Sequence, residues 1–211
     1  MPMNKSFAIF DMDGTLVDSM AFWCRLPREY LDSKGIHQIP ADVLEQIKPL
    51  TMSQSAQLFA RRFDLGGTAE AIAGEMNQMM EIHYRRDIPL KPGVKEYLEG
   101  LKAKEIAMCV ASATAKSLME VCLARLGIRD CFSFLLSCEE VGAGKERPDV
   151  YLEAARRLGC APREAAVYED ALYAAATAKQ AGFYVVAVYE RMAAERWEEL
   201  KKLADEAIRV F

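Results

Sequence analysis

The chain has 211 residues, 52% of them hydrophobic, which suits one large domain or a core with a small accessory domain. Its net charge of −4 provides no basic footprint for a nucleic-acid partner. No apolar run approaches the roughly 18 residues that a transmembrane helix needs, so we expect no membrane partner.

The N-terminus and the cysteines indicate a cytoplasmic protein. The segment Met1–Lys5 lacks the long apolar stretch of a signal peptide. The cysteines are scattered, contain no C-x-x-C pair and in several cases lie in apolar stretches; they are Cys24, Cys109, Cys122, Cys131, Cys138 and Cys160. We therefore expect reduced, mostly buried thiols.

The first element is a short buried strand at Phe7–Phe10, which runs directly into Asp11-Met12-Asp13-Gly14-Thr15. Two carboxylates this close repel each other, and each raises the pKa of the other unless a positive charge neutralises them. A divalent metal is the usual partner, because hard cations take carboxylate oxygens. Asp11 and Asp13 therefore predict a metal site at the end of this strand.

Residues 17–88 carry helical patterns only. Met76, Met79, Met80 and His83 recur at i, i+3, i+4 and i+7, one stripe of a helix that we interpret as the core of this insertion. Because the insertion begins just after the acidic motif and returns through a stiff linker, we expect it to overhang the site as a lid. The helical patterns lie at about 18–34, 41–48, 53–63 and 68–86, and the linker at Ile88–Gly93.

The rest of the chain alternates strand and helix signals, which predicts a parallel sheet covered by helices on both faces. In such a sheet, ligands bind at the carboxyl ends of the strands. We assign residues 1–16 and 89–211 to a core domain and residues 17–88 to a helical domain. The predicted strands are 106–111, 132–136, 165–168 and 183–189, and the predicted helices are 115–126, 148–158, 171–181 and 194–203.

Three further polar features follow strands of this core. Ser112 and Ala113 precede a helix start, where a hydroxyl and free N–H groups suit a phosphate. Lys145 lies in a loop before the helix that Pro148 opens, and Glu169-Asp170 follows a strand. Taken singly, these features are equally typical of a helix N-cap, a solvated loop charge and an acidic pair at a helix start.

Together the four features make a charge argument. Asp11, Asp13, Glu169 and Asp170 place four carboxylates at one edge of the sheet, with Lys145 as the nearby cation. This arrangement is favourable with a bound Mg²⁺ and a phosphate that bridges metal and lysine. A carboxylate can attack phosphorus and form an aspartyl-phosphate.

In order and spacing, these motifs resemble those of the haloacid dehalogenase superfamily, in the branch of β-phosphoglucomutase and phosphoglycolate phosphatase. The resemblance covers nearly the whole chain. It implies a doubly wound, Rossmann-like α/β core with an inserted α-helical cap, and a catalytic Mg²⁺. It also implies that Asp11 is the nucleophile and a Mg²⁺ ligand, and that Asp13 is the general acid and base and offers its backbone carbonyl to the metal.

The resemblance assigns the other motif residues as well. Ser112 and Ala113 bind the phosphoryl oxygens, and Lys145 pairs with nucleophile and phosphate. Asp170 completes the metal shell, with Glu169 binding directly or through water. In this family the second aspartate separates phosphatases from dehalogenases, so the presence of Asp13 argues against dehalogenation.

Two departures from the family pattern matter. The fourth motif usually continues Asp-Ser-x-x-Gly, whereas Ala171 and Ala174 replace the serine and glycine here. The mutase branch carries a basic Arg-Leu-Lys-Gly-type stretch on its cap. The corresponding stretch here, Ile47–Met52, retains Lys48 and lacks the arginine, which weighs against a mutase.

The sequence thus predicts a cytoplasmic, Mg²⁺-dependent phosphatase of a small phosphorylated metabolite, such as a sugar phosphate or a phosphoglycolate-like acid. One alternative is a β-phosphoglucomutase-like phosphomutase. Another is a non-enzymatic switch module phosphorylated on aspartate. The oligomeric state is open, with a monomer favoured.

Overall fold

The computed structural model describes residues 5–47 and 52–211, which form two compact units. One unit contains the residues up to Ser19 together with Ile88–Phe211, and the other contains Met20–Asp87. Lys48, which the mutase argument used, lies outside the described residues, as do the three residues after it.

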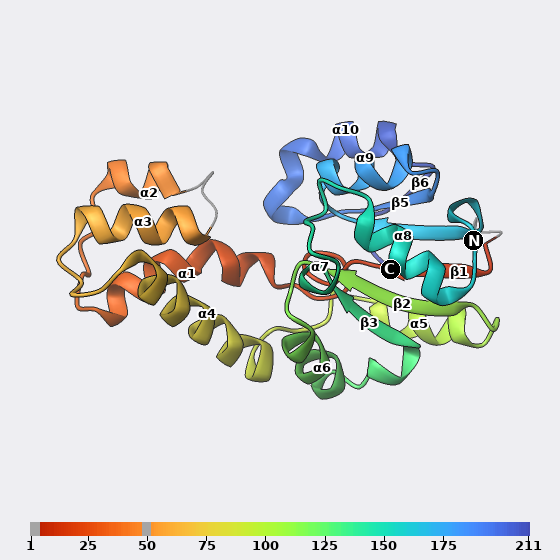
Figure 1. Cartoon of the computed structure of the whole chain (residues 1–211), viewed down its shortest axis with the longest axis horizontal. Coiled ribbons are helices and arrows are strands. Elements are labelled where there is room, and N and C mark those ends of the chain that lie inside the picture. The colour runs from red at the N-terminus through yellow and green to blue at the C-terminus, as the bar shows by residue number, and fades with distance from the viewer. Residues whose placement is uncertain (1–4, 48–51) are drawn as a thin grey trace. The chain divides into compact units, whose positions relative to one another are not determined.

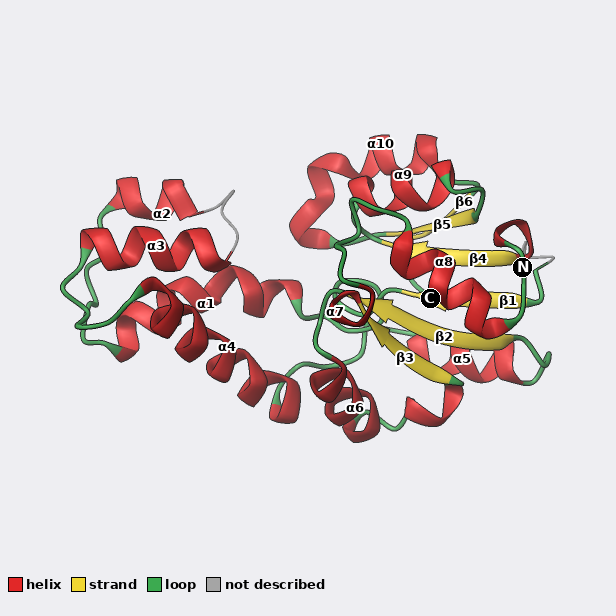
Figure 2. Cartoon of the chain, in the orientation of Figure 1, coloured by secondary structure: helices red, strands yellow, loops and turns green. Residues whose placement is uncertain are grey.

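The larger unit is built on a six-stranded parallel sheet with the order β3-β2-β1-β4-β5-β6 (Figures 1 and 2). The central strand β1 pairs with β2 on one side and β4 on the other, so that Phe10 lies opposite both Val110 and Tyr168. The strands are β1 (Phe7–Phe10), β2 (Ala107–Ser112), β3 (Phe134–Ser137), β4 (Ala165–Glu169), β5 (Tyr184–Val188) and β6 (Glu206–Ile208).

Helices cover both faces of this sheet, as Figure 2 shows, because its strands are apolar on both sides. On one face, Ile9 of β1 and Val167 of β4 join a buried cluster with Val150 and Ala154 of α8. On the other face, Phe10 stacks on Tyr168 with ring centroids 4.1 Å apart. The helices of this unit are α5 (Val94–Lys102), α6 (Lys116–Arg125), α7 (Cys138–Val141), α8 (Asp149–Leu158), α9 (Leu172–Gln180) and α10 (Trp197–Leu203), with 3₁₀ turns η1 (Arg129–Cys131), η2 (Pro162–Glu164) and η3 (Arg191–Arg196).

The predicted α/β fold with a doubly wound parallel sheet is therefore confirmed. Its predicted strands are found with shifts of one or two residues at their ends. Sequence patterns missed the helix α5, the short helix α7 and the edge strand β6. The strand β6 has three residues, all at least partly exposed, so it lacks the apolar run that marks a buried strand.

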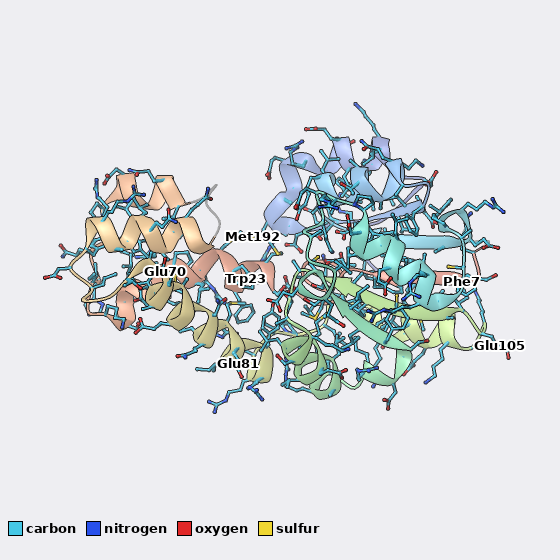
Figure 3. The ribbon with its side chains drawn as sticks, viewed as in Figure 1. Phe7, Trp23, Glu70, Glu81, Glu105 and Met192 are labelled. Atoms are coloured by element: carbon cyan, nitrogen blue, oxygen red, sulfur yellow. The ribbon has the colours of Figure 1, made fainter. Side chains whose placement is uncertain are left out.

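The described residues of the smaller unit form four helices: α1 (Met20–Ser33), α2 (Ala41–Ile47), α3 (Met52–Arg62) and α4 (Ala69–Arg86). The buried stripe of α4 is Ile72, Met76, Met80 and Tyr84. Of the predicted stripe, Met76 and Met80 thus lie in the core, whereas Met79 and His83 are half-buried at its edge. The His83 ring lies between Glu29 and Asp87, at 3.0 and 2.8 Å. Trp23, labelled in Figure 3, donates its indole N–H to Tyr84 Oη at 3.1 Å.

The cysteines differ in burial, and the described helices differ from membrane-spanning helices in length or polarity. Cys109, Cys122 and Cys138 are buried, whereas Cys131 and Cys160 are half-buried and Cys24 is exposed, so only half of the thiols follow the expectation of burial. None of the cysteines, which all lie in the described part of the chain, forms a disulfide. Among the described residues, every helix is too short or too polar to cross a membrane.

Candidate active site

The pairing of β1 with β4 brings the first and fourth motifs together. Asp11 directly follows β1, and its backbone N–H donates to the carbonyl of Tyr168 at 3.0 Å. This bond continues the β1–β4 ladder by one residue. Glu169 ends β4 and Asp170 follows it, so their side chains emerge beside Asp11 at the carboxyl edge of the sheet.

Three carboxylates converge at this edge. Oxygens of Asp11, Glu169 and Asp170 lie within 4.8 Å of one another, and all three residues are buried. Lys145, also buried, forms ion pairs with Asp11 and with Glu169, the latter at 2.5 Å between Nζ and Oε1. One ammonium against three carboxylates leaves a local excess of negative charge. Oxygen donors alone make this set suitable for a hard divalent cation.

The pKa values of the group follow from burial and mutual repulsion. Burial raises the pKa of Asp11 well above its usual value, and Lys145 offsets only part of this rise. Burial, reinforced by the carboxylate of Glu169, raises the pKa of Asp170 to about 7. Burial alone would lower the pKa of Lys145, but the carboxylates of Asp11 and Glu169 more than offset this and raise it above its usual value. A divalent cation would remove the cost of ionising both aspartates, so the residues present fit a metal.

Asp13 has a different environment from the other carboxylates. Ser19 Oγ donates to Asp13 Oδ1, and Thr114 Oγ1 donates to Asp13 Oδ2, each at 2.6 Å. Its side chain does not belong to the three-carboxylate group, so a metal contact from Asp13 would have to use its backbone carbonyl. The two donated hydroxyl hydrogen bonds hold the Asp13 carboxylate in one orientation. A fixed orientation suits a carboxyl group that exchanges protons with a substrate.

The second motif surrounds the end of β2. Ser112 is the last residue of β2 and is buried, and its Oγ accepts a hydrogen bond from the backbone N–H of Thr114 at 3.1 Å. Accepting this bond leaves the hydroxyl hydrogen available for an anion. Ala113 is exposed beside it, and α6 begins at Lys116. The structure therefore places these residues at the same edge of the sheet as the acidic group.

Several residues that the sequence reasoning missed support the carboxylates. Tyr151 on α8 donates to Glu169 Oε1 at 2.6 Å, and Thr15 donates to Asp170 Oδ1 at 3.3 Å. Thr15 and Thr114 lie inside or beside the quoted motifs, so they could have been proposed from position alone. Ser19 follows the acidic motif by a few residues and reaches Asp13 locally, whereas Tyr151 carries no comparable sequence signal, because the packing of α8 against the sheet brings it to Glu169.

The two replaced positions of the fourth motif are accommodated. Ala174 is completely buried in α9, so the core accommodates the methyl group that a glycine at this position would lack. Ala171 takes the N-cap position of α9 without a side-chain hydrogen bond. The carboxylate geometry of Glu169 and Asp170 is thus reached without the usual serine.

Residues 8–188 match the model of the haloacid dehalogenase-like hydrolase family. The chain belongs to this family. The predicted superfamily is confirmed, and so is the prediction that the protein is a hydrolase of this type.

Curated relatives and solved structures of the family are similar over most of the chain. Hexitol phosphatase B of Escherichia coli is 30% identical over 172 residues, which are 81% of this chain and 78% of the relative. The fructose-1-phosphate phosphatase of the same bacterium is 29% identical over 85% of this chain and 94% of its own length. The structure of a β-phosphoglucomutase from Clostridium difficile has the same fold, with a TM-score of 0.70 and 23% identity over 98% of this chain and 91% of that one.

Proposed function

We propose that this protein is a Mg²⁺-dependent phosphatase that hydrolyses a small phosphorylated metabolite through an aspartyl-phosphate on Asp11. The observation that carries the proposal is the buried group of Asp11, Glu169 and Asp170 with the Lys145 ammonium bonded to two of its members. The phosphatase names of the curated family members support the same reaction class.

In the first half-reaction, a carboxylate oxygen of Asp11 attacks phosphorus, and the bond between phosphorus and the ester oxygen breaks. Asp13 gives its proton to the departing oxygen, which leaves as an alcohol. As negative charge is redistributed over the phosphoryl oxygens, Lys145 neutralises it and Ser112 binds one of these oxygens through its hydroxyl group. The carboxylates of Asp11 and Glu169, which raise the pKa of Lys145 against the effect of burial, keep it charged for this role.

In the second half-reaction, water attacks the phosphorus of the aspartyl-phosphate. The ionised Asp13 takes a proton from this water, the bond between phosphorus and the Asp11 oxygen breaks, and inorganic phosphate is released. Ser19 and Thr114, which donate to the two oxygens of Asp13, hold its carboxylate in place in this step.

The side chains of Asp11, Glu169 and Asp170, with the backbone carbonyl of Asp13, are the groups that would hold the metal. When bound, Mg²⁺ supplies charge neutralisation for the phosphoryl oxygens and for the carboxylates themselves.

For the substrate, we propose a phosphorylated sugar, polyol or similar small metabolite. The curated relatives are named for hexitol and fructose-1-phosphate substrates, which supports this class. We further propose that residues 17–88 act as a cap that restricts water during turnover, since the insertion follows the first motif directly. We also propose a monomeric, cytoplasmic enzyme; for the compartment, the free cysteines of the described residues agree with a reducing environment.

The test is a phosphate-release screen over hexose phosphates, hexitol phosphates, nucleoside monophosphates and phosphoglycolate. The wild type should release phosphate with Mg²⁺ and stop in EDTA, whereas Asp11→Asn should be inactive in both. Asp130→Asn, an exposed aspartate of the same unit, is the matched control and should keep full activity. Conversion of a sugar phosphate to its isomer without free phosphate would replace the proposal with a mutase. A stable phosphoprotein without turnover would indicate a switch module.

A further inference from the structure

Lys91 is a largely buried cation that the reaction scheme does not use. Its side chain is 13% exposed, and its Nζ donates to three oxygens. These are the carbonyl of Gly14 at 2.6 Å, the carbonyl of Tyr189 at 2.5 Å and Oε2 of Glu190 at 3.0 Å. An ammonium has three hydrogens to donate, so all of them are used inside the protein.

The two carbonyls belong to segments that are not neighbours in the sheet. Gly14 lies in the turn after β1, and Tyr189 follows β5. Between β1 and β5 lies β4, whose end carries Glu169 and Asp170. Lys91 therefore connects the two strand ends that flank the metal-binding carboxylates of β4.

The turn that Lys91 contacts is the acidic motif itself. Gly14 has φ of +81°, a left-handed conformation that suits glycine. Its N–H donates to the carbonyl of Val17 at 2.9 Å, and the N–H groups of Leu16 and Val17 both donate to Met12, at 2.9 and 3.0 Å. The Gly14 peptide directly follows the Asp13 carbonyl, which the proposed function gives to the metal.

Lys91 is also fixed along its own backbone. Its N–H donates to the carbonyl of Leu16 at 3.0 Å, so the linker already pairs with the segment after the turn. Glu190 is 2% exposed, and its second oxygen accepts from the N–H of Met192 at 3.0 Å. The buried ion pair is thus fully hydrogen-bonded, which is the condition under which such a pair is tolerated.

We propose that Lys91 is a positioning residue that holds the Gly14 peptide, and with it the Asp11–Thr15 turn, in the geometry needed to bind the metal. The inference rests on the proposed function for its catalytic consequence, but the ordering of the turn does not depend on it. A role in stability alone would come from pairing with Glu190, whereas a positioning role comes from the bond to Gly14. The two roles can be separated by substituting both members of the ion pair.

The experiment compares Glu190→Gln with the double variant Lys91→Met and Glu190→Gln. Methionine keeps the apolar stem of Lys91, and glutamine avoids leaving a buried charge without a partner. Hydrogen exchange of peptides covering residues 11–17 reports the order of the turn, calorimetry reports Mg²⁺ affinity, and phosphate release gives kcat/KM. Lys95→Met, on an exposed lysine of α5, is the matched control.

We expect Lys95→Met to resemble the wild type. Glu190→Gln should unfold at a lower temperature, because it leaves the Lys91 ammonium without its counter-charge, but it should keep the wild-type exchange of residues 11–17 because the bond to Gly14 remains. In the double variant, amides of residues 11–17 should exchange about tenfold faster, and Mg²⁺ affinity and kcat/KM should each fall about tenfold. Unchanged exchange, or unfolding of the double variant while Glu190→Gln folds, would overturn the positioning role. If the turn loosens as expected but the wild type hydrolyses no phosphate ester, the proposed function fails and this inference stands.

Discussion

Tyr151 donates its phenolic hydrogen to Oε1 of Glu169 at 2.6 Å, and the same oxygen accepts from Lys145 at 2.5 Å. Tyr151 is completely buried on α8, so it holds the carboxylate from the helical layer while Lys145 holds it from the loop before that helix. One oxygen of Glu169 thus takes two donors, which leaves Oε2 for the proposed metal. This makes Tyr151 a structural support of the acidic group.

Tyr151→Phe should weaken Mg²⁺ binding about tenfold, because outer hydrogen bonds orient the carboxylates that hold a metal. The fold should tolerate the change with a loss of about 1 kcal/mol of unfolding free energy, since one hydrogen bond is removed. Calorimetric titration with Mg²⁺ measures the first effect and thermal unfolding the second. Tyr184→Phe, a half-buried tyrosine of β5, is the control. An Mg²⁺ affinity equal to that of the wild type would show that Lys145 orients Glu169 unaided.

Asp11→Asn should lower phosphate release by more than about a hundredfold, since covalent catalysis needs the carboxylate. Without metal, the variant should unfold at the same temperature as the wild type or a higher one. The reason is that burial and neighbouring carboxylates make ionised Asp11 unfavourable, and the amide carries no charge. Activity and thermal midpoints in EDTA provide the two measurements. Residual turnover above about a hundredth of wild type would remove Asp11 from the role of nucleophile.

Asp13→Asn should affect substrates according to their leaving groups. A sugar alkoxide needs a proton in order to leave, whereas p-nitrophenolate does not, so the loss should be far larger on sugar phosphates. With p-nitrophenyl phosphate, the variant should also accumulate phosphorylated Asp11, because hydrolysis of this species still needs a base. Paired rate measurements and intact-mass spectrometry detect both effects. Equal losses on the two substrates, with no phosphoryl adduct, would leave Asp13 with a structural role only.

The stability of the metal-free protein should depend on pH through Asp11 and Asp170. Burial raises the pKa of Asp170 to about 7 in the folded protein and raises that of Asp11 in the same direction. In the unfolded chain an aspartate titrates near about 4, so between about pH 4 and 7 the folded state binds more protons. The free energy of unfolding should therefore fall as the pH rises through this window.

Mg²⁺ should reverse this fall in the free energy of unfolding, because binding the cation displaces the protons that Asp11 and Asp170 retain in the folded protein. The increase in thermal midpoint caused by Mg²⁺ should grow from about pH 5 to about pH 8. Thermal scans with EDTA and with Mg²⁺ across this range measure it, and Asp170→Asn should remove the part of the pH dependence that Asp170 contributes while leaving that of Asp11. An Mg²⁺ effect that is constant over the range would mean that these carboxyls are already ionised without metal.

The sequence by itself determined the local features of this protein. The apolar run Phe7–Phe10 before Asp11, and the one before Glu169, predicted two strands with acidic ends. A parallel sheet places such ends at one edge, so the meeting of Asp11, Glu169 and Asp170 followed from the alternation of strands and helices. These signals are readable because strand propensity and motif spacing are set by residues adjacent in the chain.

Only the tertiary structure decided which side chains support these carboxylates. Thr114 reaches Asp13 across 101 positions of sequence, and Lys91 reaches Glu190 across 99. A threonine or lysine has the same local pattern whether it faces solvent or a buried carboxylate, so no window of sequence separates the two cases. The edge strand β6 was missed for a related reason: its pairing with β5, rather than any apolar run of its own, makes it a strand.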